Sequence, residues 1–340
     1  MEQKTVLVTG ADSLLGTHVI RCLLECRYRV RGMTRHPHKF RLKPQCRLEL
    51  VKGNIHDPHS FSRHLKGCDQ VIHISPGTSR NLLRYADYYA EHVRSAHLLV
   101  QQSIRYRIKR FVYVGATCCF GFGSREKPGD ESRTPGKPFS ASHYAKSKQE
   151  AQDLVLHYRK KIEVVVVNPA CMLGPYDQEP ASGRILLRGY RKKWIFHPPG
   201  GKNFIPATDA AGGVVKALQK GKNGESYLLC GENLSYRELF EKLSHTTGNI
   251  PRYVQIPRPL LVGIGMLGDV IRFFGIANSF TLHRMRLLCT HRFYASHKAA
   301  AELEWQPTPV EPAIREAIHW FEHNSLFVGK NYSKKRGVRY

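Results

Sequence analysis

The feature that most constrains this chain is a short apolar run that ends at a glycine and is followed at once by a helical pattern. Residues 4–9 (KTVLVT) are rich in β-branched side chains, which favours a buried strand. Gly10 follows, and apolar residues then recur at helical spacing from Leu14 to Glu25. A strand, a tight turn and a helix in this order begin a βαβ unit, so the sequence predicts an α/β fold.

Further apolar runs alternate with helical patterns through the first half of the chain. We expect strands at 28–33, 48–52, 71–74, 110–114 and 163–167, a helix at 88–103, and another that begins at Pro58 with Asp57 as its N-cap. This alternation predicts a Rossmann doubly wound parallel sheet with right-handed crossovers. The continuous run at 164–167 is typical of a strand covered on both faces.

The pattern loosens after about residue 170. Helical segments are expected at 210–220, 236–247 and 312–324, between stretches rich in Pro and Gly. We therefore predict a Rossmann domain at 1–170 and a smaller, mostly helical C-terminal part at 171–328 that shapes the substrate pocket, with some segments returning to the Rossmann sheet. The basic tail at 329–340 is expected to be disordered.

The most apolar later stretch is 260–276, which Asp269 and Arg272 interrupt. Without those charges it is too short to span a bilayer, so no transmembrane segment is expected. We interpret it as a buried or interfacial helical hairpin, with peripheral docking on a membrane surface as the alternative.

Cysteine and histidine usage and the net charge bear on the compartment, on metal binding and on nucleic-acid binding. The 9 cysteines form no C-x-x-C pair, which favours a reducing, cytoplasmic compartment, and the 18 histidines include no H-E-x-x-H motif, so we expect no metal. The formal net charge of +26 is interpreted as a solvated basic surface. Specific nucleic-acid binding is disfavoured because no recognition motif accompanies the charge. A homodimer stays an open alternative without a visible interface.

The turn after the first strand has the context of a dinucleotide-binding loop. In T9-G10-A11-D12-S13-L14-L15-G16, Gly10 permits the tight turn, and Gly16 lets the helix pack closely on the sheet. Ser13, Leu14 and Leu15 open the helix, whose free N–H groups and positive dipole end favour a pyrophosphate. Ser13 replaces the middle glycine of the usual pattern, which narrows the approach to the phosphate, although its hydroxyl can donate a hydrogen bond.

The end of the second strand favours NADP(H) over NAD(H). An NAD site usually carries Asp or Glu about 20 residues beyond the loop, where it binds the ribose 2′-hydroxyl. Here the sequence has Arg35, with Lys39 close behind, and no carboxylate. A guanidinium at this point suits a 2′-phosphate. The alternative is that Arg35 belongs only to the basic surface.

Tyr144 and Lys148 form a candidate acid/base pair. They are four residues apart in a predicted helix, so they share one face of it. A tyrosine has a pKa near ~10 in isolation, and a neighbouring ammonium favours the phenolate and lowers that pKa. Tyrosine then becomes a usable proton donor to a carbonyl or acceptor from an alcohol.

These motifs together resemble the extended short-chain dehydrogenase/reductase superfamily, that is, the NAD-dependent epimerase/dehydratase family. The resemblance covers nearly the whole chain through TGADSLLG, VKGNIHDP, VIHISP, YAKSK, NPACMLGP, FIPATDAAGGVVKAL and ESYLLCGE. Sugar-nucleotide epimerases usually carry Arg-Pro where this chain has Asn168-Pro169. That pair, with Arg35, resembles the dihydroflavonol-reductase-like branch.

The resemblance implies roles for further residues. Tyr144 is then the acid/base, and Lys148 binds the nicotinamide ribose and tunes the tyrosine. Asn54 and Ile55 lie by the adenine, and Ser75 and Pro169 line the cofactor channel.

The family also places a Ser or Thr after the fifth strand to hydrogen-bond the reacting oxygen. The alignment puts Ala116 there, and Thr117 serves only if the loop shifts by one residue. An aligned donor of this kind typically contributes a few kcal/mol to the barrier. Cys118 and Cys119 are interpreted as packing residues rather than nucleophiles.

The sequence therefore supports three hypotheses. The first is an NADP(H)-dependent carbonyl reductase or alcohol dehydrogenase acting on a small organic substrate. The second is a nucleotide-sugar epimerase or dehydratase with tightly held NAD. The third is a non-catalytic dinucleotide-binding scaffold or sensor, which the departures at Ser13 and Ala116 motivate.

Overall fold

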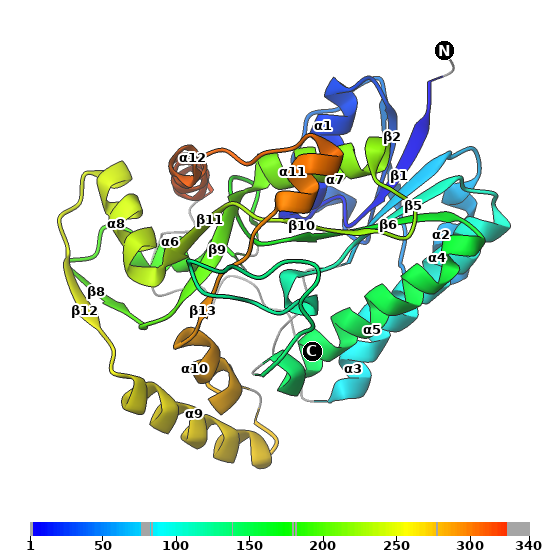
Figure 1. Ribbon diagram of the computed structural model, residues 1–340. Helices are drawn as coiled ribbons and strands as arrows, with labels where there is room; N and C mark the ends of the chain where they lie inside the picture. The colour runs from blue at the N-terminus through cyan, green and yellow to red at the C-terminus, as the bar shows by residue number, and fades with distance from the viewer. Residues whose placement is uncertain are drawn as a thin grey trace.

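Seven parallel strands form the core of the protein (Figure 1). A computed structural model describes residues 3–324, apart from 76–81, 83, 138, 179, 181 and 277. The strands stand in the order β10-β6-β5-β4-β1-β2-β3. Their bounds are β1 Thr5–Thr9, β2 Arg29–Thr34, β3 Leu48–Lys52, β4 Gln70–Ile74, β5 Arg110–Val114, β6 Glu163–Pro169 and β10 Ser226–Leu229. The predicted Rossmann sheet is confirmed, and the six strands expected from the sequence lie within one or two residues of the observed ones.

Helices cover both faces of this sheet. Helices α1 (Leu14–Glu25) and α7 (Ala207–Lys220) pack on one face, and α4 (Ser95–Arg105) and α5 (His143–His157) pack on the other. The valines of β6 divide accordingly, since Val165 and Val167 belong to one apolar core and Val164 and Val166 to the other. Burial on both faces explains why the run at 164–167 shows no alternation of apolar and polar residues.

Two elements from beyond residue 170 complete the core. β10 pairs with β6, and α7 packs against α1. The short helix α2 (Pro58–Phe61) begins as expected, because the Asp57 side chain accepts a hydrogen bond from the His59 backbone N–H. The basic tail at 329–340 lies outside the described residues.

The helix expected at 88–103 is longer and is interrupted. It consists of α3 (Tyr85–Tyr89), a π-helical segment η3 (Ala90–Arg94) and then α4. A π segment accommodates one extra residue in a turn and often occurs at functional sites. Its position matters here because η3 packs against α5.

The C-terminal part combines short strands with helices. β7 (Cys171–Leu173), β9 (Gly201–Pro206), β11 (Glu232–Ser235) and β13 (His291–Arg292) form one small sheet, and β8 (Trp194–His197) pairs with β12 (Arg252–Gln255). Helices α6 (Arg184–Gly189), α8 (Tyr236–Thr247) and α12 (Val310–His323) pack on a third apolar core, and α11 (His297–Leu303) packs on α7. Because β7 follows β6 after a single residue, this part begins at the carboxyl end of the sheet.

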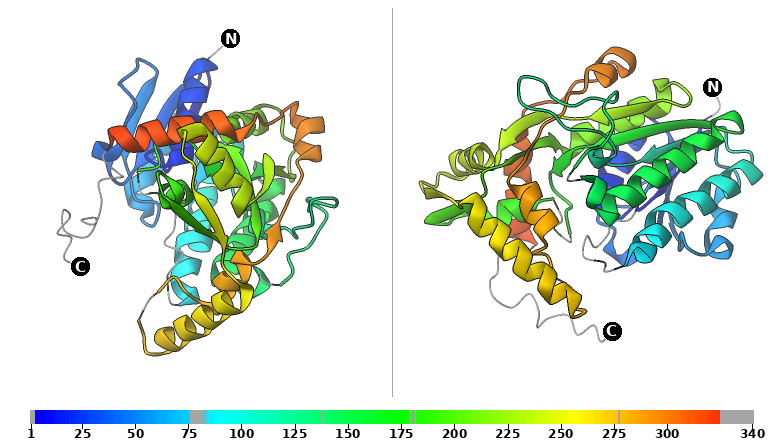
Figure 2. Two further views of the ribbon diagram at one scale, coloured as in Figure 1. Left: turned by 90° about the vertical axis from the view of Figure 1, so that its left-hand side faces the viewer. Right: turned by 60° about the horizontal axis from the view of Figure 1, so that its bottom comes forward.

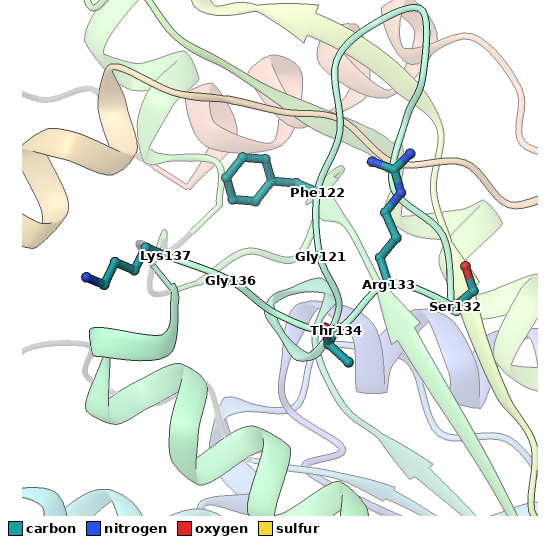
Figure 3. A pocket seen from close by; sticks show the side chains of 7 residues that line it. All are labelled: Gly121, Phe122, Ser132, Arg133, Thr134, Gly136 and Lys137. Atoms are coloured by element: carbon teal, nitrogen blue, oxygen red, sulfur yellow. The ribbon is translucent and has the colours of Figure 1, made fainter.

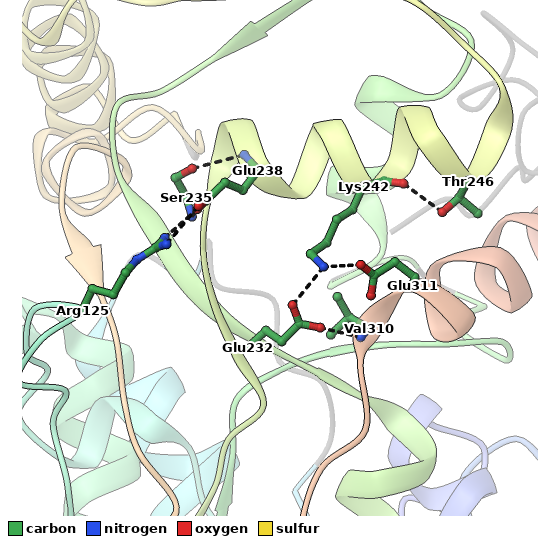
Figure 4. Close-up of polar contacts among 8 residues, drawn as sticks. All are labelled: Arg125, Glu232, Ser235, Glu238, Lys242, Thr246, Val310 and Glu311. Atoms are coloured by element: carbon green, nitrogen blue, oxygen red, sulfur yellow. Dashed lines mark hydrogen bonds and ion pairs between the residues drawn. The ribbon is translucent and has the colours of Figure 1, made fainter.

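An ionic network joins the elements around α8 (Figure 4). Lys242 contacts the carboxylates of Glu232 and Glu311, and Glu232 also accepts a hydrogen bond from the Val310 backbone N–H at 2.7 Å. The α8 helix therefore connects β11 to the start of α12.

A separate group of contacts at the start of α8 reaches the segment between β5 and α5 (Figure 4). Arg125 donates to both oxygens of Glu238, at 3.0 and 2.6 Å. Glu238 also closes a capping box with Ser235 at the start of α8. The bidentate pair ties the segment that follows β5 to the C-terminal part.

The apolar stretch at 260–276 forms a helical hairpin, but much of it is not buried. α9 (Arg258–Phe273) packs chiefly against the short helix α10 (Leu282–Leu288), and the pair projects from the body of the molecule (Figure 2). Leu261 is 5% exposed, whereas Phe273 is 86% exposed. The outer face of this hairpin is therefore exposed, so the interpretation of the stretch as fully buried is wrong for that face. Among the described residues, no helix is long and apolar enough to cross a bilayer.

Candidate functional site

The predicted site residues come together at the carboxyl edge of the parallel sheet. Gly10, Arg35, Ser75 and Thr117 follow the ends of four strands, and Pro169 is the last residue of β6. The strand order reverses between β1 and β4. In open α/β sheets, ligands bind in the crevice outside the carboxyl ends at such a switch point.

The loop after β1 has the backbone geometry that a phosphate-binding turn requires. Gly10 has a φ of +64°, and a Cβ there would lie 2.8 Å from the Ile74 carbonyl oxygen. A Cβ on Gly16 would lie 2.1 Å from the Gly10 carbonyl oxygen, so only glycine permits this close approach of helix and loop. In the first turn of α1, Leu15 is buried and Leu14 is half-buried.

Ser13 is the N-cap of α1. Its hydroxyl donates to the Gly10 carbonyl at 2.7 Å and accepts from the Gly16 N–H at 3.0 Å. The hydroxyl proton is therefore used inside the loop, and Ser13 can present its backbone rather than its side-chain donor to a ligand. Gln178, which follows β7, donates to the carbonyl oxygens of Asp12 and Lys39 and so bridges this loop to the segment after β2.

The segment after β2 presents an exposed cation. Arg35 is exposed, and its charge contributes to the lowered pKa of the Glu91 carboxyl, although hydrogen bonding from His56 contributes most. The His56 Nε2 lies 3.4 Å from the Glu91 carboxylate. Arg35, after β2, therefore has the Glu91 carboxylate of the π segment as an electrostatic neighbour. The sequence did not reveal this neighbour.

The turn after β3 places the two predicted adenine-side residues differently. Ile55 is buried, whereas Asn54 is exposed and its side-chain oxygen accepts from the His56 N–H. The pair therefore offers an apolar side chain beneath the turn and a polar group at its surface.

Several buried polar atoms near the ends of β4, β5 and β6 have no hydrogen-bond partner among the described residues. These atoms are the Ser75 hydroxyl, the Tyr113 hydroxyl, both side-chain polar atoms of Asn168 and the Gln152 carbonyl oxygen. A buried polar group without a partner costs about 1–3 kcal/mol, so such atoms need an explanation. A polar ligand that binds at this edge would explain them and would fit the fold.

Tyr144 and Lys148 lie on one helix beside this edge, as predicted. Ser142 caps α5 by accepting from the Ala145 N–H. Tyr144 is half-buried, whereas Lys148 is only 4% exposed. The Tyr144 ring makes edge-on contacts with His92 and Tyr88, with centroids 5.3 and 6.4 Å away. The His92 Nδ1 in turn lies 2.7 Å from the Ser147 hydroxyl, so η3 fixes the start of α5.

The titratable groups around Lys148 are held uncharged at neutral pH. Burial, with a further contribution from the Lys148 ammonium, lowers the pKa of His73 to about 3 and that of His92 to about 2. A hydrogen bond with Cys118 in which the Cys119 thiol donates, together with burial, raises the pKa of that thiol well above its usual range. A buried ammonium among neutral groups favours an anion next to it.

The loop after β5 contains Thr117, the residue whose hydroxyl is predicted to hydrogen-bond the substrate oxygen. Ala116 is in extended conformation, and Thr117 begins the short turn η4 (Thr117–Cys119), which packs against α5. The Thr117 side chain lies beside the Tyr294 hydroxyl, whose pKa burial raises. Cys118 and Cys119 are 7% and 1% exposed, consistent with their interpretation as packing residues.

An open hollow of about 400 Å³ lies between the two halves of the loop that joins β5 to α5 (Figure 3). Phe122 and Lys137 line one side of it, and Ser132 and Arg133 lie on the other. None of the predicted cofactor residues lines it. The hollow is therefore separate from the predicted cofactor residues.

Sequence reasoning missed His92, Glu91 and His73. A single histidine or glutamate in a helical pattern gives no signal of its partner. The only available hint was that Tyr88 and His92 are four residues apart and so share a helix face.

Comparison with known proteins identifies the family. The model of the NAD dependent epimerase/dehydratase family matches residues 6–230, which include the loop after β1, the Tyr–Lys pair and the ends of all seven core strands. The chain belongs to this family. The resemblance inferred from the sequence motifs is thus confirmed.

Related proteins have different printed activities. The chain is 27% identical to sterol demethylase protein B of Methylococcus capsulatus over 95% of this chain and 99% of that protein. It is 25% identical to a putative dihydroflavonol 4-reductase of Synechocystis over 93% and 94% of the two chains. The crystal structure of gox2253 superposes with a TM-score of 0.82 at 27% identity, covering 95% of this chain and 99% of that one. An enzyme of the oxidoreductase or dehydratase type follows, and the relatives leave its substrate open.

Proposed function

We propose that the protein is an NADP(H)-dependent oxidoreductase that reduces a carbonyl, or oxidises the corresponding alcohol, of a small organic substrate. The observation that carries the proposal is the meeting of a glycine-built phosphate loop and a Tyr–Lys pair at one edge of the sheet. The similarity to a putative dihydroflavonol reductase supports it.

The residues present fit a dinucleotide. Gly10 and Gly16 permit the tight turn and the close approach of α1 to the loop, and the first N–H groups of α1 suit a pyrophosphate. Arg35 suits a 2′-phosphate, Ile55 suits the adenine, and Ser75 and Asn168 offer unpartnered polar atoms at the nicotinamide end. The bound nicotinamide would supply the hydride chemistry.

Tyr144 would move the proton. Its phenol would donate to the substrate oxygen during reduction and accept from the hydroxyl during oxidation. Lys148 favours the phenolate because its ammonium is buried among groups held uncharged. His92 and Tyr88 would hold the phenol ring in place through their edge contacts. Thr117 would donate a hydrogen bond to the same substrate oxygen.

The proposal is tested by measuring NADPH oxidation with a panel of ketones and aldehydes. Tyr144→Phe should lower kcat by about 10²–10⁴-fold while leaving NADPH affinity within a few-fold. Tyr85→Phe is the matched control, because Tyr85 lies nearby on α3 and its hydroxyl contacts Glu150 rather than the predicted substrate position. Equal activity of Tyr144→Phe and wild type would contradict the assignment.

A second candidate is an epimerase or dehydratase acting on a nucleotide sugar. The family model that matches the chain carries that description, and Arg133 and Lys137 at the hollow beside α5 would suit a diphosphate. Such an enzyme retains NAD and consumes none. Heating the purified protein and finding stoichiometric released NAD, with no net oxidation of added NADPH, would favour this candidate over the reductase.

A further inference from the structure

The outer face of α9 is apolar along its whole length. Eight large apolar side chains of this helix and of the described residues just after it are each more than half exposed: Leu260, Met266, Leu267, Val270, Phe273, Phe274, Ile276 and Phe280. Between Arg258 and Arg272, at the two ends of the helix, Asp269 is the only charged residue of α9. Contiguous exposed apolar surface of this kind marks a site that another phase or molecule covers.

The helix is held firmly in this exposed position. A Cβ on Gly268 would lie 1.8 Å from the Phe280 carbonyl oxygen, and one on Gly265 would lie 2.6 Å from the Leu282 Cα. These glycines let the inner face of α9 pack directly on the segment that leads into α10. Pro259 stands in the first turn, and Gly275, with a φ of +80°, follows the last one. The hairpin, residues 258–288, is therefore a built element with one face left uncovered.

The charge on and around the hairpin is strongly positive. Residues 258–292 contain five arginines and one carboxylate, Asp269. The side chain of Asp269 accepts from the Leu282 N–H and so contributes to the start of α10. Arg258 and Arg286 are exposed. An apolar face flanked by arginines is the pattern of a helix that lies in the headgroup region of an anionic bilayer.

The hairpin is connected to the site edge in two places, through Arg272 near its turn and through the chain that follows α10. The Arg272 guanidinium donates to the Leu82 carbonyl, in the segment that follows β4 and Ser75. After α10, the chain continues into β13 and reaches Tyr294, beside Thr117. The hairpin therefore contacts the segment that follows β4, at the edge that holds the predicted site residues.

We propose that the hairpin docks the protein on an anionic membrane surface, with α9 lying in the plane of the interface. At 16 residues, α9 is shorter than the roughly 20 that a transmembrane helix needs, which fits surface docking rather than insertion across the bilayer. Arg258 and Arg286 contact lipid phosphates while the exposed phenylalanines enter the acyl boundary. If the oxidoreductase proposal also holds, docking brings the site to substrates dissolved in the membrane.

The proposal is tested by co-sedimentation of the full chain with vesicles of phosphatidylcholine alone and of phosphatidylcholine with phosphatidylglycerol. We expect binding to the anionic vesicles and at least tenfold weaker binding to the neutral ones. Phe273→Ser/Phe274→Ser should weaken anionic vesicle binding at least about tenfold, because both rings lose the favourable transfer of apolar surface from water into the bilayer. The control is Tyr106→Ser, an exposed aromatic at the end of α4, which should bind as wild type does.

A second variant separates charge from apolar contact. Arg258→Glu/Arg286→Glu should abolish the preference for anionic vesicles, whereas Arg21→Glu, on the exposed side of α1, should keep it. Size-exclusion chromatography accompanies each variant. Absence of vesicle binding, or a dimer that Phe273→Ser/Phe274→Ser dissociates without any vesicle binding, would overturn the proposal. Binding is read without substrate, so its failure is distinct from a failure to reduce carbonyls.

Discussion

Three histidines are buried in an uncharged state, which makes the stability of the fold depend on pH. His18, His73 and His92 are each at most 3% exposed. Burial lowers their pKa values from 6.5 to about 4, 3 and 2 respectively. Below pH 6.5 the unfolded chain takes up protons that the folded chain does not. The stability due to the neutral imidazoles is therefore complete above pH 6.5 and is lost as the pH falls toward the folded values.

The size of the effect follows from these values. Between about pH 7 and pH 5, each histidine lowers the free energy of unfolding by about 2 kcal/mol, so the three together lower it by roughly 6 kcal/mol. That is a large share of the roughly 5–15 kcal/mol by which domains are stable. We expect the urea midpoint of the wild type to fall steeply over this range.

A single substitution isolates one of the three titrations. His18→Gln should make the loss of unfolding free energy between about pH 7 and pH 5 smaller by about 2 kcal/mol. Carboxyl groups titrate equally in both proteins, so their contribution cancels in the difference. The free energy at about pH 8, where the imidazoles are neutral in both states, measures the separate cost of repacking against Pro175 and Tyr176. If the free energy of unfolding of His18→Gln depends on pH as that of the wild type does, the conclusion that His18 is buried in its neutral form is wrong.

Three further predictions concern the loop after β1, the ion pair between Arg125 and Glu238, and the Thr117 hydroxyl. Gly16→Ala should cost about 1–3 kcal/mol and lose NADPH binding in a fluorescence titration, because its Cβ would lie 2.1 Å from a backbone oxygen, whereas Gly263→Ala, which meets nothing within 4 Å, should bind normally. Glu238→Gln keeps the α8 cap but loses the charge pair with Arg125. Because both side chains are more than a third exposed, thermal unfolding should show a loss of only about 0.5 kcal/mol at neutral pH. That loss should shrink as the pH falls from 4.5 toward 2, since hydrogen bonding from Arg125 lowers the pKa of Glu238 to about 2. Thr117→Val should lower kcat by about 10²-fold with unchanged NADPH affinity, and retention of wild-type kcat would exclude this hydroxyl from the chemistry.

The core of the fold was predictable because local signals and packing agree there. Strands such as β6 are continuous apolar runs because the sheet is covered on both sides, and α8 starts at its Ser235 cap. The site at the sheet edge was predictable in outline because parallel strands bring their carboxyl ends together. The return of β10 to the sheet depends on a long-range pairing with β6, which the sequence suggested only in general terms.

Other features depend on contacts that no local pattern encodes. The apolar stretch of α9 has the composition of a buried helix, and nothing in it states that only its glycine-lined face finds a partner. The environment of Tyr144 and Lys148 is similar in kind. It depends on η3 turning His92 toward Ser147, and a π segment leaves no clear trace in the sequence.

In our proposal, the edge between β1 and β4 holds NADP(H), and Arg35 binds its 2′-phosphate. The most direct test is an equilibrium fluorescence titration of the purified protein with NADPH and with NADH, repeated with Arg35→Ala and with the control Arg21→Ala. We expect the wild type to bind NADPH more tightly than NADH. Arg35→Ala should lose about 1.5–3 kcal/mol of binding free energy for NADPH and none for NADH. Equal affinities for the two dinucleotides in wild type, or no binding of either, would contradict the proposal.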